Sequence, residues 1–148
     1  MASKLKFEII TPERVVLKDE VDQITLPTAE GEITVLPNHI PLIGVLRPGE
    51  IVAKKDREEI AMSCSGGFIE VTGDKVLILA DTAEKAEELV EAEILKAKER
   101  AQKIIEEKQV DAERYANAAA SLERELARLK VVRKRSRGRA APSIKVEE

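Results

Sequence analysis

The chain has 148 residues, enough for one ordinary domain with an appendage. Aromatic residues make up 2% of it and hydrophobic residues 43%, so any core must be built from aliphatic side chains. One cysteine, Cys64, excludes an internal disulfide, and one histidine, His39, excludes metal sites that need several histidines.

Charge is distributed unevenly along the chain. Residues 1–83 contain 9 basic and 14 acidic side chains, whereas residues 84–148 contain 16 basic and 14 acidic ones. The segment 130–139 holds six basic residues and no acidic one. A basic end on an otherwise acidic protein favours contact with an acidic partner, and a solvated tail is the alternative interpretation.

Short apolar runs separated by turn residues fill the first half of the sequence. Six of the seven glycines and five of the six prolines lie at or before Gly73. Turn signals recur at intervals of roughly 8–12 residues, and Gly73-Asp74 is a good hairpin signal. This pattern predicts an antiparallel β-sandwich over residues 1–83. Strands are expected at 5–9, 15–17, 24–26, 33–36, 51–53, 68–71 and 76–79.

Two prolines bracket the single histidine in the segment Pro37–Pro41. Because proline lacks a backbone N–H, we predict a rigid, extended loop here, outside any central strand. Such a loop is either a packed corner or a docking surface.

The second half has helical periodicity. Asp81, with Glu84 three residues later, predicts a helix N-cap, and Asp111 predicts a second one. Two apolar stripes rich in alanine then predict an antiparallel helical hairpin over residues 84–135. Gly138 and Pro142 are expected to end the second helix, which leaves residues 136–148 as a basic, disordered tail. The predicted stripes are Ala86, Val90, Ile94, Ala97, Ala101, Ile104 or Ile105 and then Ala112, Tyr115, Ala116, Ala119, Leu122, Leu126, Leu129.

Motifs for catalysis are missing from the sequence. The segment Ser63–Gly67 lacks the glycine spacing of a nucleophile elbow, so it is interpreted as a bend between strands. The Gly66-Gly67 pair has no following lysine and is not a phosphate-binding loop, and no aromatic platform for nucleic acid is present. A β domain followed by a charged hairpin therefore favours an interaction protein over an enzyme.

Several segments together resemble the epsilon subunit of F-type ATP synthases. The resemblance covers about residues 4–134 in order and spacing. The segments that carry it are 7–12, 31–42, 65–71, 76–81 and 126–131. It implies a flattened ten-stranded β-sandwich followed by a two-helix hairpin, an α+β fold.

The resemblance also implies a noncatalytic role in the central rotor stalk. The sandwich is expected to bind the gamma subunit and the c-ring, and so to couple proton or sodium translocation to ATP synthesis. The hairpin is expected to extend into the alpha/beta catalytic head and inhibit ATP hydrolysis. The protein is then peripheral to the inner cell membrane on its cytoplasmic side, held there only through the complex, and is neither a homo-oligomer nor a nucleic-acid binder.

Site residues follow from the resemblance by position. The expected c-ring contacts are Glu30, Gly31 and Glu32. The expected gamma contacts are His39, Pro41 and Leu42. The expected contacts with the beta subunits of the head are Arg124, Arg128, Arg133, Lys134 and Arg135.

The chain departs from the family pattern in two places. Thr34 and Asn38 stand where the family commonly has glycine, so the shape of that loop is expected to differ. Residues 89–94 lack the Asp and Arg of the signature with which some members bind ATP, so we predict weak or absent ATP binding at the hairpin and no cofactor. A freestanding adaptor that binds an acidic partner through the basic hairpin is the alternative function.

Overall fold

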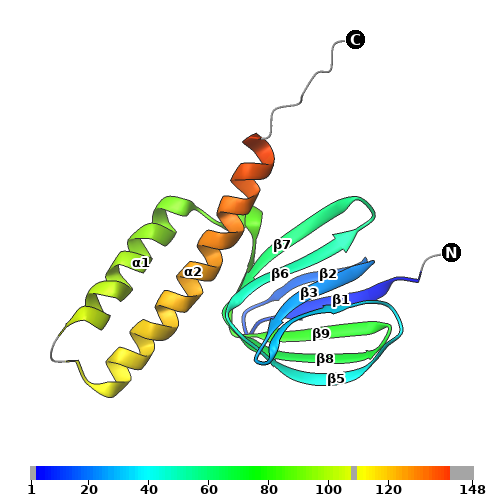
Figure 1. The fold of residues 1–148 in the computed structure, drawn as a ribbon, viewed down its shortest axis with the longest axis horizontal. Helices are drawn as coiled ribbons and strands as arrows, with labels where there is room; N and C mark the ends of the chain where they lie inside the picture. Colours follow the sequence, from blue (N-terminus) through cyan, green and yellow to red (C-terminus); the bar gives the residue numbers. More distant parts are fainter. Residues whose placement is uncertain (1–2, 108–109, 141–148) are drawn as a thin grey trace, which may run out of the picture.

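The computed structural model describes residues 3–107 and 110–140, with side chains described as far as residue 135. A β-sandwich is followed by two long helices, which confirms the predicted fold class (Figure 1). In the described part of the chain, no helix is long and apolar enough to cross a membrane. The strands are β1 Leu5–Ile10, β2 Val15–Val21, β3 Gln23–Thr28, β4 Gly31–Val35, β5 His39–Leu46, β6 Gly49–Lys55, β7 Glu58–Cys64, β8 Gly67–Gly73, β9 Lys75–Ala80 and β10 Ala83–Lys85.

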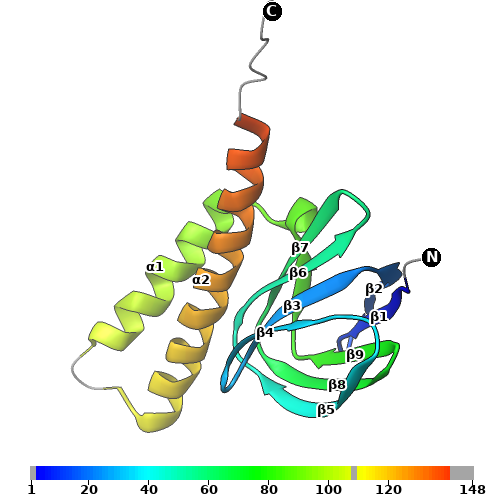
Figure 2. The same cartoon turned by 45° about the vertical axis from the view of Figure 1, so that its right-hand side comes forward.

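The ten strands form one hydrogen-bonded sheet that folds over into two layers. The strand order is β10-β7-β6-β3-β5-β8-β9-β1-β2, with β4 paired to β3. A single register pair, Thr28–Leu46, joins β3 to β5, and the sheet turns over at this junction (Figure 2). One layer therefore contains β10, β7, β6, β3 and β4, and the other contains β5, β8, β9, β1 and β2. β1 and β9 run parallel, whereas the other described pairs are antiparallel.

Aliphatic side chains fill the space between the two layers. Phe7 is the one aromatic residue of this core and is almost completely buried. Its neighbours alternate along each strand with exposed residues, as expected for a two-layered sheet. The largest buried side chains besides Phe7 are Leu5, Ile9, Ile24, Leu26, Ile51, Met62, Ile69 and Ile78.

The predicted Gly73-Asp74 hairpin is confirmed between β8 and β9, and Gly73 adopts a φ of 58°. Asn38 also has a positive φ, 63°, which its short polar side chain tolerates. Thr34 lies within β4 opposite Thr25, where a β-branched side chain is favourable.

The prediction of a loop at Pro37–Pro41 is wrong from His39 onward, because β5 begins at that residue. Its pairing with β8 is irregular between His39 and Leu42. Pro41 lies in this irregularity, where no backbone N–H is needed, so the strand accommodates a proline.

The prediction that Asp81 caps a helix is also wrong. Ala83 pairs instead with Cys64, in the short strand β10 along β7, and its side chain is buried. This tertiary contact overrides the local helix signal. A 3₁₀ turn at Ala86–Glu88 follows, and helix α1 spans Glu91–Glu106.

Helix α2 spans Ala112–Ala140 and lies between α1 and the sandwich (Figures 1 and 2). The prediction of Asp111 as its N-cap is confirmed, since the Arg114 backbone N–H donates to Asp111 Oδ1 at 2.7 Å. The prediction that Gly138 ends the helix is wrong, because a glycine inside a helix costs only about 1 kcal/mol. Residues 136–140 are thus helical, and residues 141–148 of the predicted tail lie outside the described residues.

The predicted stripe on α1 is confirmed at Ile94 and Ala101, which are buried. On α2 it is wrong for Ala112, Tyr115, Ala116 and Leu126, which are exposed. The helix contacts both α1 and strands β6 and β7, so its buried residues do not form one stripe. They are Ala118, Glu125, Ala127, Leu129 and Val131.

Candidate functional site

A group of charged residues joins helix α2 to the sandwich. Arg128 on α2 donates from Nη1 to Glu125 Oε1 at 2.7 Å and from Nε to Glu84 Oε2 at 3.3 Å. Its Nη2 also bonds to Glu84 Oε1. Ser63 on β7 donates to Glu84 Oε2 at 2.8 Å. We call Arg128, Glu84, Glu125 and Ser63 the Arg128 cluster.

Burial makes this cluster sensitive to the loss of any charge. The Glu125 side chain is only 3% exposed, and those of Arg128 and Glu84 are each 21% exposed. Arg124 Nε lies 3.5 Å from Glu125 Oε1 and adds a second positive charge. Two carboxylates thus face two guanidinium groups, which compensates the cost of burying each charge.

The end of α2 makes further polar contacts. Lys134 Nζ lies 3.1 Å from Glu50 Oε1 on β6, and Arg135 Nη1 donates to the Ala86 carbonyl at 3.2 Å. Arg133 Nε donates to Glu91 Oε1, also at 3.1 Å, but Glu91 belongs to α1. The Lys134 and Arg135 contacts therefore bind the hairpin to the sandwich and the linker, whereas the Arg133 contact stays inside the hairpin.

The linker between the two parts is fixed separately. Arg14, in the turn before β2, donates two hydrogen bonds to the Glu88 carboxylate, at 2.7 and 2.9 Å. These bonds hold the pKa of the Glu88 carboxyl below its usual value of 4.5. The chain is thus anchored as far as Glu88, three residues before α1 begins.

The outer face of the second layer carries a row of apolar side chains. Register pairs align Val45, Phe68, Leu79, Ile10 and Val15 across five neighbouring strands. Phe68 is 61% exposed, and Val45, Leu79 and Val15 are each at least half exposed. We call these five residues the apolar row. Ile43 lies two residues before Val45 on the same face of β5 and is 80% exposed.

The predicted partner-contact residues of the sandwich lie in two separate places. Glu30 lies in the β3–β4 turn, and Gly31, with a φ of 123°, and Glu32 begin β4; the three residues are exposed. This turn lies beside the Leu46 end of β5.

His39 and Pro41 lie at the opposite end of β5, where His39 pairs with Gly73. Leu42 packs against the core, whereas its neighbour Ile43 points outward. The structure therefore does not bring the two predicted sets together.

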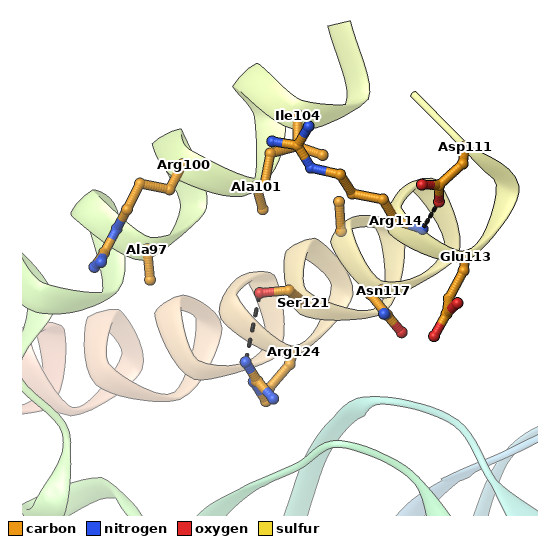
Figure 3. Close-up of a pocket in the computed structure, with 11 residues that line it drawn as sticks. Ala97, Arg100, Ala101, Ile104, Asp111, Glu113, Arg114, Asn117, Ser121 and Arg124 are labelled. Atoms are coloured by element: carbon orange, nitrogen blue, oxygen red, sulfur yellow. Dashed lines mark hydrogen bonds between the residues drawn. The ribbon is translucent and has the colours of Figure 1, made fainter. Parts of the chain in front are cut away.

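An open groove of about 550 Å³ lies between α1 and α2 (Figure 3). Ala97 and Ala101 line one side, so the helices meet there through small side chains. The guanidinium groups of Arg100, Arg114 and Arg124 point in different directions and do not converge on one point (Figure 3). This arrangement offers no charged cradle for a phosphate group.

A second groove, of about 500 Å³, lies where the hairpin meets the linker. Four glutamates line it together with Lys96, Arg100 and Arg128, and Arg128 is already paired. Those glutamates are Glu84, Glu88, Glu93 and Glu125. Glu84 and Glu125 hold Arg128, and Arg14 holds Glu88, so a phosphate group would compete with these carboxylates for Arg128.

The predicted bend within the segment Ser63–Gly67 is confirmed at Ser65 and Gly66, between the end of β7 and the start of β8. Cys64 is buried, and burial raises the pKa of its thiol to about 11. Its Sγ lies 3.5 Å from the Gly66 carbonyl oxygen and 3.4 Å from the Gly66 nitrogen. A thiol held in the neutral form here is a packing group and not a nucleophile.

Sequence reasoning missed the apolar row and the acidic partners of α2. The row had a signal, since Val76–Leu79 is apolar at consecutive positions, and so both faces of β9 must be apolar. The sequence carries no signal for Glu84, Glu50 and Glu125 as partners of α2, because it does not show whether a glutamate is exposed or lies against another element.

Comparisons with known proteins agree with this architecture. The family model for the ATP synthase delta/epsilon chain β-sandwich domain matches residues 4–86. An ATP synthase epsilon chain from Dehalococcoides mccartyi is 46% identical over 133 residues, which are 90% of this chain and 95% of the relative. Another from Herpetosiphon aurantiacus is 41% identical over 131 residues, covering 88% of this chain and 96% of that one.

Solved structures share the fold. A chain of the Euglena gracilis mitochondrial ATP synthase (OSCP/F1/c-ring) superposes with a TM-score of 0.75 at 24% identity, covering 86% of this chain and 80% of that one. A chain from the central stalk and c-ring of the Tetrahymena thermophila enzyme gives a TM-score of 0.58 at 15% identity, with 88% and 97% covered. The family match and the identity over nearly the whole length show that this chain belongs to the ATP synthase epsilon-chain family and is a non-catalytic subunit of that complex.

Proposed function

We propose that the sandwich docks on the gamma subunit and the c-ring, and so couples proton or sodium translocation to ATP synthesis. The observation that carries this proposal is the apolar row on the outer sheet face. Monomeric proteins rarely leave a contiguous apolar patch exposed, so such a patch marks an interaction surface. In this complex the protein lies at the cytoplasmic face of the inner cell membrane, peripheral to the bilayer.

The gamma subunit is the proposed occupant of the apolar row. Covering a large apolar side chain contributes about 1.5–3 kcal/mol, so Phe68 is the expected anchor of the contact. The expected gamma contacts at the start of β5 adjoin this face. His39 and Pro41 lie beside Ile40 and Ile43, two of the most exposed apolar side chains described.

The c-ring contact is proposed at the β3–β4 turn. Glu30 and Glu32 are exposed there, and the turn is held by the Thr28 hydroxyl, which donates to the Gly31 carbonyl at 2.6 Å. A short turn fixed in this way presents its carboxylates without a large loss of conformational freedom.

The hairpin is proposed to inhibit ATP hydrolysis when it extends into the catalytic head. Its basic residues Arg124, Arg128, Arg133, Lys134 and Arg135 would then meet acidic surfaces of the beta subunits. In the folded state, four of these residues donate a hydrogen bond to a carboxylate or carbonyl oxygen. The fifth, Arg124, has its Nε 3.5 Å from Glu125 Oε1. The same chemistry therefore suits an acidic partner.

Binding to a catalytic head that contains gamma but lacks epsilon tests the proposed docking. We expect Phe68→Asp to weaken binding about 100-fold, since a charge replaces an apolar anchor. Arg57→Asp, in the exposed β6–β7 turn, is the matched control and should bind like the unaltered chain. Equal binding by both variants would contradict docking through the apolar row. Steep loss of wild-type binding with salt would favour the adaptor function instead.

A further inference from the structure

The basic residues of α2 differ in where their acidic partners lie. Glu84, on β10, and Glu50, on β6, belong to the sandwich, whereas Glu91 belongs to the hairpin itself. Lys134 Nζ also lies 4.0 Å from Glu59 Oε2 on β7, a longer contact. Glu84 and Glu50 supply the shorter charge contacts that hold the hairpin against the sandwich. If the hairpin extends as proposed above, on which this inference rests, those two contacts must break and the Arg133–Glu91 contact need not.

We propose that Glu84 and Glu50 set the population of the folded hairpin by competing with the catalytic head for Arg128 and Lys134. The sandwich thus carries its own acidic surface for the same two basic side chains. The folded state is the complex of the hairpin with this internal surface, and the inhibitory state is its complex with an external one.

The geometry of the Arg128 cluster keeps the exchange from leaving Arg128 or Glu84 without a hydrogen-bond partner. Glu125 lies one helical turn before Arg128 on α2, so it moves with Arg128 when the hairpin leaves. Glu84 stays behind and keeps the hydrogen bond from Ser63. Neither Arg128 nor Glu84 then loses all of its polar contacts.

The Lys134–Glu50 pair differs from the Arg128 cluster in the exposure of its basic side chain. The Lys134 side chain is 47% exposed, whereas that of Glu50 is only 8% exposed. Glu50 lies on β6, and in the described part of the chain its carboxylate accepts a hydrogen bond from Lys134 at Oε1, while its buried Oε2 has no hydrogen-bond partner. Because Arg14 anchors the linker through Glu88, the backbone change can be confined to Leu89 and Val90, which lie between this anchor and α1.

Distances between two spin labels on the full-length chain test the inference without any other subunit. Arg57→Cys in the β6–β7 turn and Glu113→Cys on α2 supply exposed labelling sites, and Cys64 is buried. In the Glu84→Gln/Glu50→Gln variant we expect the ratio of open to folded hairpin to rise roughly ten-fold, because two partly buried ion pairs are weakened together. Glu91→Gln is the matched control and should leave the distances unchanged. Circular dichroism verifies that every variant keeps its helices.

Measuring the inhibition of ATP hydrolysis distinguishes the loss of the acidic partners from the loss of the basic ones. With a gamma-containing head, Glu84→Gln/Glu50→Gln should inhibit more strongly than the unaltered chain, since its Arg128 and Lys134 are released. Arg128→Gln/Lys134→Gln should also open the hairpin but inhibit less, since it lacks the side chains that meet the head. Unchanged label distances in Glu84→Gln/Glu50→Gln would overturn the inference. Changed distances with no effect of either variant on hydrolysis would support the internal competition but contradict the proposed inhibitory function.

Discussion

Arg128 and Glu84 are 44 residues apart in sequence, yet the guanidinium of Arg128 donates to both carboxylate oxygens of Glu84. One residue lies on the last helix and the other on the last strand. This contact joins the sandwich, which binds partners in the proposed function, to the hairpin, which regulates. It also links the stability of the folded hairpin to residues that are expected to contact the catalytic head.

Removing Arg128 is predicted to destabilise the folded hairpin strongly. Arg128→Ala leaves the buried Glu125 without its main partner, and such losses cost about 3 kcal/mol. Urea unfolding monitored by helical circular dichroism measures this effect. Arg133→Ala removes an exposed pair instead and should cost less than about 1 kcal/mol. Equal losses in both variants would contradict the structural role of the cluster.

Gly67 is predicted to tolerate no side chain. A Cβ at this position would lie 2.1 Å from the Leu79 carbonyl oxygen, where β8 pairs with β9. Gly67→Ala should therefore lower the free energy of unfolding by about 3 kcal/mol or more. Gly73→Ala meets no neighbour within 4 Å and should cost only about 1 kcal/mol, for its left-handed backbone. Thermal unfolding of both variants measures the difference, and equal melting temperatures would refute it.

Acid is predicted to release the linker. The pKa of Glu88 is lowered by the hydrogen bonds from Arg14, so the folded state favours the charged carboxylate. The resulting stabilisation is fully present above pH 4.5 and disappears as the pH falls through the lowered pKa. Unfolding midpoints of the unaltered chain and Glu88→Gln should thus differ at neutral pH and converge in acid. Glu87→Gln, next to it and exposed, should follow the unaltered chain at every pH.

Cys64 is predicted to resist thiol reagents. Its thiol is buried and has a pKa of about 11, so very little thiolate exists at neutral pH. A chromogenic disulfide reagent should react with it only after denaturation, whereas Arg57→Cys should add one thiol that reacts at once. Rapid reaction in the folded, unaltered chain would contradict the burial of Cys64.

ATP is predicted to stabilise the hairpin little. Residues 89–94 lack the Asp and Arg of the ATP-binding signature, and Glu84 and Glu125 hold Arg128 at the linker groove. Millimolar ATP should shift the melting temperature by less than about 1 °C. A large upward shift with ATP, absent with tripolyphosphate, would show a specific site and refute this prediction.

The sequence was most informative where local chemistry decides the structure. Alternating apolar residues marked the sandwich strands, Gly73-Asp74 marked a hairpin, and Asp111 marked the start of α2. Asp81 led to a wrong prediction of a helix start, because its cap signal competes with strand pairing between β10 and distant residues on β7. His39–Pro41 misled because a strand irregularity can hold a proline without loss of backbone hydrogen bonds.

The candidate site was only half predictable. Arg128 and Lys134 could be named from the basic end of the helix, but their partners Glu84 and Glu50 could not. Those partners lie 44 and 84 residues away, and only the folded chain brings them close. The apolar row likewise depends on the register of five strands, which no single segment encodes.

The central claim, that the sandwich anchors the subunit and the hairpin restrains hydrolysis, is tested most directly with a gamma-containing head that lacks epsilon. Binding and ATP hydrolysis are recorded while the full-length chain is added, and again with a variant that has glutamine at positions 124, 128, 133, 134 and 135. Both chains should bind equally, and only the unaltered chain should slow hydrolysis. Equal inhibition by both chains, or none by the unaltered one, would contradict the account.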